Sequence, residues 1–460
     1  MLELREALAW LSAGRIEADD PRADATVVGG VSTDTRSVRP GELFVAIRGE
    51  LHDAHDYVGR AIDAGAAAVL VERPVPDRRV PALVVPDCRR ALGEIAAGWR
   101  RRFAPPVIAV TGSNGKTTTK EMIAAILAAH VGEDARLATR GNLNGDIGVP
   151  LTVLRMHAGH RAAVVELGMN HPGEIAWLAS IAQATVALVL NAQREHQEFL
   201  RTVEATAREN GASLAALPAD GVAVFPGDDA HAPIWRELAG ARARIEFGTA
   251  PGCAVSAAPD ARPEGFEMRV DGAAIEVALA IDGAHSVRNA LAAAACCSAI
   301  GVPPAAIAAG LAAFRPASGR LRRLVARTGA ALIDDSYNAN PDSVRAAIDV
   351  LAAQPAPRVL VLGDMGEVGE QGPRFHAEVG GYAKARGVQT LLAFGAASVG
   401  TAAAFGEGAE HFGTIEAVCD RAAALAAPGA TVLVKGSRSM RMERVVQALA
   451  GSAASQGGHH

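Results

Sequence analysis

The segment with the clearest chemical potential begins at Val107. An apolar stretch, Val107 to Val110, leads directly into the turn Thr111-Gly112-Ser113-Asn114-Gly115-Lys116-Thr117-Thr118. A short strand that enters a glycine-rich turn and then a helix can hold a nucleotide phosphate, because the glycines let backbone N–H groups approach the phosphate oxygens. Lys116 can neutralise negative charge there, and the Thr117 hydroxyl is placed to bind Mg²⁺. The sequence therefore predicts an ATP site at this turn.

This turn differs from the common phosphate-binding pattern in one position. Val110 stands where that pattern has a glycine, six positions before the lysine. The alternative interpretation is a glycine-rich turn that contains a lysine by chance. It would require the strand, the two glycines, the lysine, the hydroxyl pair and a following helix, predicted over Glu121 to Ala129, to coincide.

Lysine is rare in this chain. Of 45 basic residues only four are lysines, at Lys116, Lys120, Lys384 and Lys435. Lys116 and Lys435 both lie in glycine-flanked loops that follow apolar strands. Because a flexible ammonium group and a planar guanidinium group do different work, we expect these two positions to require lysine.

Polar side chains also end two other predicted strands. Glu166 lies in the strand Ala162 to Leu167, and His196 follows the strand Val186 to Leu190. Parallel sheets present ligands at the carboxyl ends of their strands, which makes Glu166 a candidate Mg²⁺ ligand. The alternative is a surface glutamate and a structural histidine, since histidine is a weaker magnesium ligand than oxygen donors.

Three further loops are rich in amides and charges. They are Asn142 to Pro150, Asp334 to Pro341 and Lys435 to Arg438. The first loop suits hydrogen bonding to a polar substrate, although an ordinary turn uses the same residues. The other two follow strands in the last third of the chain. Two polar surfaces that face each other across a hinge would close on a substrate and exclude water.

The elements that position these loops predict an α/β fold with three domains. A chain of 460 residues, half of them hydrophobic, exceeds one typical core. In residues 1–104, the strand 41–47, the helix 56–65 and the strand 66–71 indicate a small α/β domain. Pro105-Pro106 forms a stiff junction that marks the first boundary.

The rest of the chain divides into two larger domains. In residues 105–314, strands alternate with helices as a mostly parallel sheet requires. Residues 315–450 repeat this alternation with glycine-containing turns after the strands, which is typical of a Rossmann-like domain. The tail, residues 451–460, is predicted to be flexible, and its His459 and His460 are expected to fray rather than to bind a metal.

Composition excludes several classes of protein. A formal charge of -5 gives no basic surface for nucleic acid. We find no pattern of a signal peptide in Met1 to Leu11, and no apolar stretch approaches the length of a membrane span. Five cysteines lie without metal-ligand spacing, which favours a location in the reducing cytoplasm; they are Cys88, Cys253, Cys296, Cys297 and Cys419.

Taken together, these motifs resemble those of the Mur ligases, the ATP-dependent amide-forming enzymes of peptidoglycan precursor synthesis. The resemblance extends over nearly the whole chain. It rests on the turn 111–118, Glu166, His196, His285 with Asn289, Gly319-Arg320, Asp335 and Lys435-Gly436-Ser437-Arg438. It implies an N-terminal domain that binds the UDP end of a substrate, a central ATP-binding domain and a C-terminal Rossmann-like domain.

The resemblance also implies roles toward ATP and Mg²⁺. The turn 111–118 would bind the phosphates, Asn289 the adenine, Arg320 the phosphates and Asp335 the ribose hydroxyls. Thr117, Glu166 and His196 would be the Mg²⁺ ligands. The implied catalytic residues are Lys116, Glu166, His196 and Arg320.

Within the family, three stretches resemble the members that add D-alanyl-D-alanine to UDP-N-acetylmuramoyl-tripeptide: residues 141–150, 166–175 and 335–341. The implied substrate contacts are Asn142, Asn144, Asn170, Tyr337, Asn338, Asn340, Lys435, Ser437 and Arg438. In the N-terminal domain, Asp34, Thr35 and Arg36 are similar to the family's UDP-binding segment, and an ordinary turn is the alternative there. The implied partners are these small molecules alone, bound by a monomer.

The implied reaction has two steps. The terminal carboxylate of the tripeptide attacks the γ-phosphate of ATP and forms an acyl phosphate, which the amine of D-alanyl-D-alanine then attacks. Two other functions compete with this interpretation. Folylpolyglutamate synthetases share the chemistry but begin near the phosphate-binding turn, and a nucleotide-operated switch would leave the loops 335–341 and 435–438 unexplained.

One position departs from the family pattern. Most Mur ligases support a second Mg²⁺ with a carbamoylated lysine in a segment that resembles Ala207 to Gly211, where this chain has Asn210. A carbamate cannot form on an amide, and no lysine lies between Lys120 and Lys384. We therefore predict that the second metal is held differently, through Glu195, Glu198, Glu209 or a bound anion.

Overall fold

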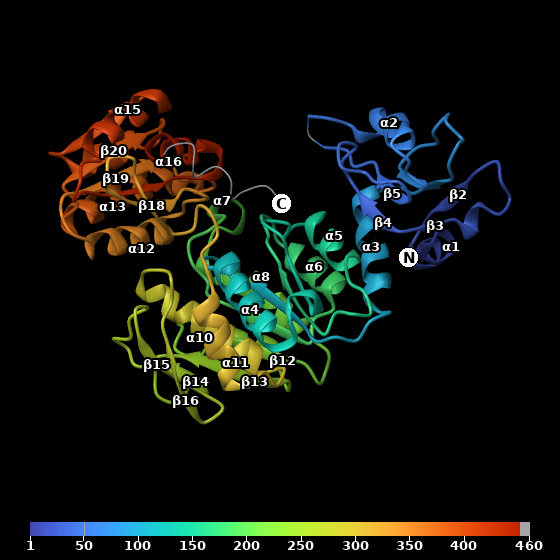
Figure 1. The fold of residues 1–460 in the computed structure, drawn as a ribbon, viewed down its shortest axis with the longest axis horizontal. Coiled ribbons are helices and arrows are strands. Elements are labelled where there is room, and N and C mark those ends of the chain that lie inside the picture. Colours follow the sequence, from blue (N-terminus) through green and yellow to red (C-terminus); the bar gives the residue numbers. More distant parts are fainter. Residues whose placement is uncertain (50, 451–460) are drawn as a thin grey trace.

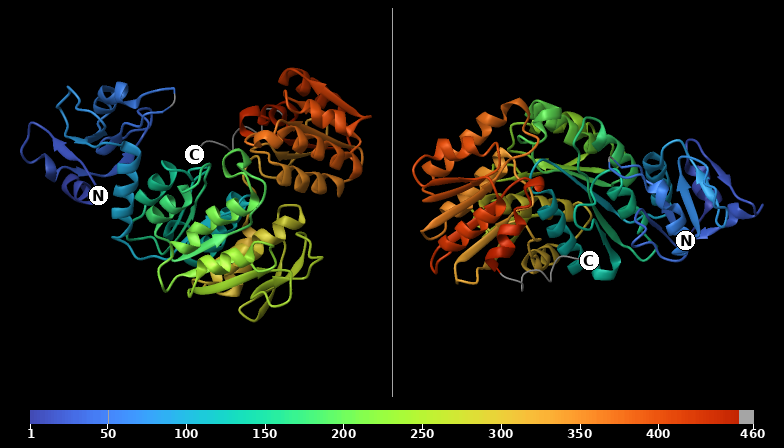
Figure 2. Two further views of the ribbon diagram at one scale, coloured as in Figure 1. Left: turned by 180° about the vertical axis from the view of Figure 1, so that it is seen from behind. Right: turned by 90° about the horizontal axis from the view of Figure 1, so that it is seen from above.

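The computed structural model describes residues 1–49 and 51–450. Within them the chain forms three α/β parts, each around its own main sheet, which confirms the predicted fold class (Figure 1). The N-terminal and C-terminal parts lie at opposite ends of the molecule with the central part between them, and the views in Figure 2 agree on this arrangement. The predicted flexible tail, with His459 and His460, lies outside the described residues.

The N-terminal part contains a five-stranded sheet and a separate strand pair. Four of the five strands are parallel, and the edge strand β2 is antiparallel to its neighbour. In spatial order the sheet consists of β2 (Arg15–Glu17), β7 (Ala82–Val84), β6 (Ala68–Val71), β5 (Glu42–Val45) and β4 (Gly30–Ser32), and the pair of β1 (Leu2–Glu3) and β3 (Val27–Val28). The helices are α1 (Leu4–Trp10), α2 (Val58–Asp63) and α3 (Cys88–Arg100).

Helix α3 joins the N-terminal part to the central part. Its glycines give room to indole rings, because a Cβ on Gly93 would lie 2.6 Å from the ring of Trp177 and a Cβ on Gly98 would lie 2.1 Å from the ring of Trp10. At its end, Trp99 Nε1 donates to the carbonyl of Met156 at 2.9 Å, across the junction. Close packing on both sides fixes the N-terminal part against the central sheet.

The central part is built on a nine-stranded sheet. Its spatial order is β16 (Ala273–Val277), β15 (Phe266–Val270), β14 (Val255–Ala257), β13 (Ala243–Gly248), β12 (Val222–Pro226), β11 (Val186–Val189), β8 (Val107–Thr111), β10 (Ala162–Glu166) and β9 (Arg136–Ala138). The strands from β9 to β14 are parallel, as predicted. The antiparallel extension through β15 and β16 was not predicted from the sequence.

Strand β8 lies between β10 and β11, and this order brings three strand ends to one edge of the sheet. In register, Glu166 pairs with Val110 and Val189 pairs with Thr111. Helix α4 (Lys116–Val131) begins directly after the turn, so it is longer than the predicted helix 121–129. The other helices are α5 (Gly148–Leu154), α6 (Glu174–Ala182), α7 (Gln197–Leu200), α8 (Val203–Ala215), α9 (Ala232–Ala239), α10 (Ala284–Ser298) and α11 (Pro304–Ala313).

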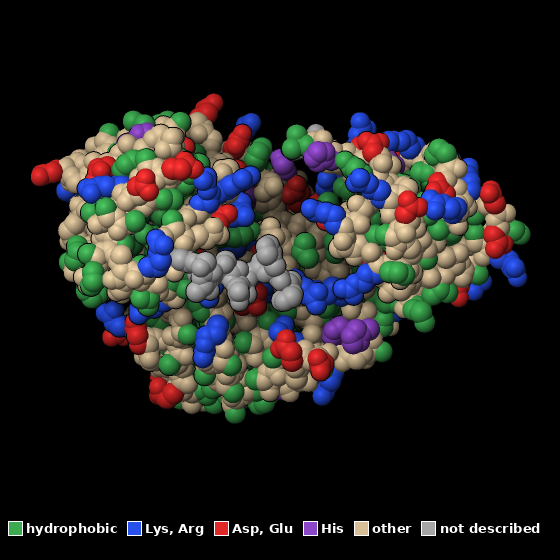
Figure 3. Space-filling model, turned by 45° about the horizontal axis from the view of Figure 1, so that its top comes forward, with side chains coloured by type: hydrophobic (Ala, Val, Ile, Leu, Met, Phe, Trp, Pro, Cys, Tyr) green, Lys and Arg blue, Asp and Glu red, His purple; other side chains and the backbone are tan. Residues whose placement is uncertain are grey.

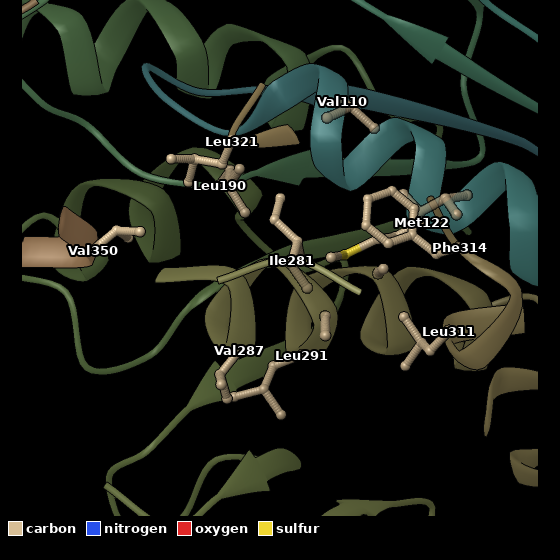
Figure 4. Close-up of a cluster of buried hydrophobic side chains, with 14 of the residues drawn as sticks. Val110, Met122, Leu190, Ile281, Val287, Leu291, Leu311, Phe314, Leu321 and Val350 are labelled. Atoms are coloured by element: carbon tan, nitrogen blue, oxygen red, sulfur yellow. The ribbon is translucent and has the colours of Figure 1, made fainter. Parts of the chain in front are cut away.

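A hydrophobic core underlies the phosphate-binding turn and extends into the C-terminal part. Figure 4 shows Val110 of β8 and Met122 of α4 close to Phe314, with Leu190, Ile281 and Leu321 packed next to them. Leu321 precedes the first strand of the C-terminal sheet and is 6% exposed. The two parts therefore share buried apolar surface near the site.

The C-terminal part has a six-stranded sheet that is parallel except for its edge strand β17. Its spatial order is β17 (Arg322–Val325), β18 (Ala331–Asp335), β22 (Thr431–Lys435), β19 (Arg358–Gly363), β20 (Thr390–Phe394) and β21 (Ala409–Phe412). The helices are α12 (Pro341–Ala352), α13 (Gly372–Ala385), α14 (Val399–Phe405), α15 (Ile415–Leu425) and α16 (Glu443–Ala450). No helix in the described residues has the length and apolar character to span a bilayer.

Adjacent glycines in α13 offer a matched test of packing in the C-terminal part. A Cβ on Gly380 would lie 2.1 Å from the backbone oxygen of Thr401 in α14, whereas a Cβ on Gly381 would meet nothing within 4 Å. We expect Gly380→Ala to lower the free energy of unfolding by about 1–3 kcal/mol, because the two helices must separate. Gly381→Ala should raise it slightly, since alanine favours a helix by about 1 kcal/mol over glycine. Calorimetric unfolding of the two variants measures the difference, and equal shifts would contradict this packing.

Candidate active site

A cavity of about 720 Å³ lies where the three parts of the chain meet. Figure 3 shows the hollow between the N-terminal and C-terminal parts, with Lys and Arg side chains along its rim. Its walls come from the phosphate-binding turn, from the segments that follow β10 and β11, and from loops of the C-terminal sheet. Parallel sheets place ligands at this kind of edge, so the cavity is the candidate site.

The turn Thr111 to Thr118, called here the phosphate loop, has a shape that two glycines and the amide of Asn191 maintain. Gly112 has a φ of +128° and Gly115 a φ of +85°. The Oδ1 atom of Asn191 accepts from the backbone N–H groups of Ser113 at 3.1 Å and of Asn114 at 2.9 Å. Such hydrogen bonds hold the loop in one conformation.

The Lys116 side chain folds back over the loop. Its Nζ donates to the carbonyls of Gly112 at 2.5 Å and Ser113 at 3.1 Å, and it lies 3.4 Å from Glu195 Oε2. The Thr111 side chain takes another direction, since its Oγ1 donates to the carbonyl of Leu188 at 2.8 Å beneath the loop. Lys116 is therefore the cation of this loop that lines the cavity.

Glu166 offers an oxygen that a metal ion could use. Its Oε1 accepts from Thr117 Oγ1 at 3.1 Å and from Asn144 Nδ2 at 2.7 Å. Its Oε2 is buried and has no hydrogen-bond partner among the described residues. Because an unpaired buried carboxylate oxygen is costly, a bound cation is a good explanation for it. The oxygen donors of Thr117 and Glu166 fit the ligand preference of Mg²⁺.

His196 lies on the C-terminal side of the cavity. Its Nδ1 is 2.7 Å from Glu367 Oε2, and its Nε2 is 3.9 Å from Glu195 Oε2. The contact with His196 holds the pKa of Glu367 below its ordinary value. Across residues 1–49 and 51–450, no group of three or more His, Cys, Asp and Glu side chains is arranged to hold a metal. A magnesium ion here would need phosphate oxygens and water as further ligands, as is usual for this ion.

Asp335 and Lys435 form an ion pair in the C-terminal wall, in which the lysine is buried and the aspartate is partly exposed. The two residues pair in register on the neighbouring strands β18 and β22. Lys435 Nζ donates to Asp335 Oδ2 at 2.6 Å and to the carbonyl of Asn338 at 2.8 Å, and the residue is 3% exposed. The flexible lysine stem reaches both acceptors, and the requirement for lysine at this position stays a prediction.

Two guanidinium groups flank the Tyr337 ring at the same wall. The Arg320 guanidinium carbon lies 4.1 Å from the ring centroid and that of Arg438 lies 5.8 Å from it. Arg438 pairs with Glu443 at 3.1 Å, whereas Arg320 forms no ion pair with any described residue. Arg320 is thus free to bind an anion in the cavity.

Direct contacts hold the C-terminal part against the phosphate loop. Asn114 and Asn340 exchange side-chain hydrogen bonds of 3.2 and 2.9 Å. Farther out, Arg194 pairs with Asp342 at 2.5 Å and with Glu378 at 2.8 Å. Motion of the C-terminal part would break or remake these contacts, so they couple the loop to domain position.

The cavity brings together most of the residues that the sequence singled out. Those that line it are Ser113, Asn114, Gly115, Lys116, Thr117, Thr118, Asn144, Glu166, Asn170, His196, Asn289, Arg320, Asp335, Tyr337, Asn338, Asn340, Lys435, Ser437 and Arg438. His285 also lines it, and burial lowers the pKa of this histidine.

Other predicted residues lie outside the cavity lining. Thr111 and Gly112 begin the phosphate loop and do not belong to the lining, and Asn142 is exposed. Asp34, Thr35 and Arg36 lie in the N-terminal part, where Arg36 pairs with Asp34 at 2.6 Å and donates its backbone N–H to the same carboxylate at 2.9 Å. These hydrogen bonds hold the pKa of Asp34 below its ordinary value.

Sequence reasoning missed Glu367 and the Arg194 ion pairs. Glu367 belongs to the acidic, glycine-containing segment 364–370 that follows β19. The same rule that identified the other loops, polar residues after a parallel strand, applies to this segment. No comparable signal existed for Arg194, because its partners are about 150 residues or more away in the chain.

Comparison with known proteins gives consistent matches along the chain. Three family models match it: the Mur ligase family catalytic domain at residues 27–100, the Mur ligase middle domain at 110–297, and the Mur ligase glutamate ligase domain at 319–438. Among curated proteins, the UDP-N-acetylmuramoyl-tripeptide--D-alanyl-D-alanine ligase of Escherichia coli strain K12 is 41% identical, over 95% of this chain and 96% of that protein. The enzyme of the same name from Bacillus subtilis strain 168 is 33% identical over 94% and 95%.

Solved structures similar to this chain belong to the same family as the matching sequences. MurF from Acinetobacter baumannii superposes with a TM-score of 0.88 at 33% identity, covering 96% of this chain and 97% of that chain. MurF ligase from Thermotoga maritima in complex with ADP gives a TM-score of 0.80 at 27% identity, covering 92% and 97%. A folylpolyglutamate synthase from Mycobacterium tuberculosis gives 0.63 at 16% identity, covering 78% and 94%, which shows a shared fold alone.

A lysine at the cavity and a lysine on the surface give a direct test of the site. Lys116 lies at the cavity, whereas Lys384 donates to the carbonyl of Glu407 and lies over the Phe405 ring on the surface of the C-terminal part. Lys116→Ala should lower phosphate release from ATP by at least about 10²-fold, the usual scale for losing one charge-stabilising group. Lys384→Ala should stay near the rate of the unaltered protein. Steady-state phosphate release measures both, and equal losses would refute this placement of the site.

Proposed function

The chain belongs to the Mur ligase family, and from this we propose that it joins D-alanyl-D-alanine to UDP-N-acetylmuramoyl-tripeptide while ATP is converted to ADP and phosphate. Relatives of this name match it over more than nine tenths of both chains. The observation that carries the proposal is that the phosphate loop and the loops 335–341 and 435–438 line the same cavity. The product is the UDP-linked pentapeptide precursor of peptidoglycan.

ATP is the phosphate donor in this proposal. The phosphate loop offers backbone N–H groups and Lys116, and a relative has been solved with ADP. The resemblance to the family assigns Asn289 on α10 to the adenine. This residue lines the cavity beside the phosphate loop, where a Cβ on Gly115 would come within 2.7 Å of its Oδ1. Arg320 would bind phosphate and Asp335 the ribose hydroxyls.

Mg²⁺ would be held by Thr117 and Glu166, whereas His196, the third ligand predicted from the sequence, lies beside Glu195 and Glu367. The buried Oε2 of Glu166, without a partner in the described residues, supports this choice. When bound, Mg²⁺ would neutralise charge on the phosphate oxygens and orient them. Asn144 keeps the Glu166 carboxylate in place through its hydrogen bond of 2.7 Å.

The first step activates the carboxylate of the tripeptide. One of its oxygens attacks the γ-phosphorus, the bond from that phosphorus to the β,γ-bridging oxygen breaks, and an acyl phosphate and ADP result. Lys116 and Arg320 would stabilise the charge on the transferring group, which is mainly an electrostatic and positioning task. Lys116 must leave its loop carbonyls to do so.

The second step forms the peptide bond. The amine of D-alanyl-D-alanine attacks the acyl carbon, a proton is lost from nitrogen, and phosphate leaves from the tetrahedral intermediate. Tyr337, Asn338, Asn340, Lys435, Ser437 and Arg438 are proposed to bind the acceptor, and Arg438 suits its carboxylate. Closure of the C-terminal part over the cavity would keep water from the acyl phosphate.

On the side of the UDP-linked substrate, we propose contacts from Asn142, Asn144 and Asn170 near the cavity and from Asp34, Thr35 and Arg36 in the N-terminal part. We also propose a monomer that acts in the cytoplasm, where the five cysteines would stay reduced. The proposed domains are 1–104, 105–314 and 315–450, since each main sheet lies within one of these ranges.

The test is phosphate release from ATP and Mg²⁺ with UDP-N-acetylmuramoyl-tripeptide, measured with and without D-alanyl-D-alanine. We expect release to require both co-substrates, and mass spectrometry to find the pentapeptide product. Glutamate with a folate in place of these substrates is the control, and it should give no release. Release that is indifferent to all acceptors would contradict a ligase and favour a nucleotide-operated switch.

A further inference from the structure

Glu195 is a buried carboxylate in the cavity wall to which the proposed reaction gives no role. The residue is 6% exposed and lines the cavity between the phosphate loop and His196. Its Oε1 has no hydrogen-bond partner in the part of the chain that the structure describes. Its Oε2 lies 3.4 Å from Lys116 Nζ and 3.9 Å from His196 Nε2. A buried carboxylate oxygen without a partner, such as Oε1, is costly, and a bound cation would stabilise it.

Lys116 is a poor permanent partner for Glu195. Its Nζ is closer to the carbonyls of Gly112 and Ser113, at 2.5 and 3.1 Å, than to the carboxylate. In the proposed reaction Lys116 turns to the phosphates of ATP. Glu195 would then face a polyphosphate without a positive neighbour, and two like charges in a partly buried site repel strongly. A further cation beside Glu195, in addition to the Mg²⁺ at Thr117 and Glu166, would remove this repulsion if it entered with the nucleotide.

The other side chains that could hold this charge are engaged elsewhere. Asn210 is 1% exposed, and its amide accepts from Gly112 N–H at 2.8 Å and donates to the carbonyl of Thr206 at 3.1 Å. Glu209 accepts from the backbone N–H groups of Gly173 at 2.9 Å and Ile175 at 3.0 Å, at the start of α6. Glu198 does not line the cavity. Of the three carboxylates predicted from the sequence to hold a second metal, Glu195 alone both lines the cavity and has a buried oxygen without a hydrogen-bond partner among the described residues.

We propose that Glu195, together with His196, binds a divalent cation that arrives with ATP, separate from the ion at Thr117 and Glu166. Phosphate oxygens and water complete its coordination, which is the usual arrangement for Mg²⁺ and explains why the described side chains alone form no metal cluster. Asn210 is a positioning residue that fixes Gly112 and carries no metal. The inference rests on the proposed binding of ATP. It gives Glu195, which has no role in the proposed reaction, the role of a metal ligand.

Counting bound Mn²⁺ tests this assignment without any turnover. Mn²⁺ replaces Mg²⁺, and electron paramagnetic resonance reports the free ion in the presence of saturating β,γ-imido-ATP. We expect two Mn²⁺ per chain in the unaltered protein and one in Glu195→Gln. Glu198→Gln is the matched control, three residues away and outside the cavity lining, and it should keep two. Glu195→Asp should keep two, with the second bound at least about tenfold more weakly.

Other results would overturn the proposal. A single Mn²⁺ in the unaltered protein, or two bound with unchanged affinity in Glu195→Gln, would show that Glu195 holds no cation. A second ion that appears only when bicarbonate is added would assign it to a bound anion. If Glu195→Gln bound neither nucleotide nor metal, Glu195→Asp would decide, because its carboxylate must restore the second ion. The count needs no tripeptide or dipeptide, so a chain that bound two ions but formed no pentapeptide would refute the proposed function and leave this inference intact.

Discussion

The position of β8 between β10 and β11 is the constraint on which the site depends. Parallel pairing in this order brings Thr111, Glu166 and Leu190 to one edge of the central sheet. The phosphate loop must turn sharply there, because a Cβ on Gly112 would lie 2.9 Å from Leu190. The backbone N–H groups of Asn114 and Gly112 donate to the side-chain oxygens of Asn191 and Asn210. The shape that receives phosphate is thus a consequence of how three neighbouring strands end.

The C-terminal part completes the site in the same way, because neighbouring parallel strands there also end at one edge of a sheet. Register between β18 and β22 sets Asp335 beside Lys435, and the loops that follow these strands carry Asn338, Asn340 and Arg438. The contact between Asn114 and Asn340 joins the two edges across the cavity. Because hydrogen bonds between side chains are weak individually, such a contact can be exchanged for contacts with a substrate when the domains move. Buried apolar packing around Leu321 joins the central and C-terminal parts next to the site.

Much of this arrangement could be predicted from the sequence because the loops of the site follow local patterns of residue types. Apolar strands followed by glycine, lysine or asparagine identified the phosphate loop and the loops after Asp335 and Lys435 without knowledge of the fold. The antiparallel extension β15–β16 was not predicted because the other strands were recognised by near-continuous apolar runs, which are typical of parallel strands. In β15 the exposed Glu267 and Arg269 alternate with buried residues instead. Pairings such as Arg194 with Asp342, and the engaged amide of Asn210, depend on tertiary distances that no local pattern records.

The central claim is that this cavity transfers phosphate from ATP to the carboxylate of the tripeptide before the amide forms. Oxygen labelling tests it most directly: UDP-N-acetylmuramoyl-tripeptide carrying ¹⁸O in its terminal carboxylate is converted with unlabelled ATP and D-alanyl-D-alanine in unlabelled water. The account predicts that each phosphate released contains one oxygen from the carboxylate, because the acyl phosphate breaks at the carbon. Phosphate without ¹⁸O would contradict it, since ATP would then have been cleaved by water or by another group.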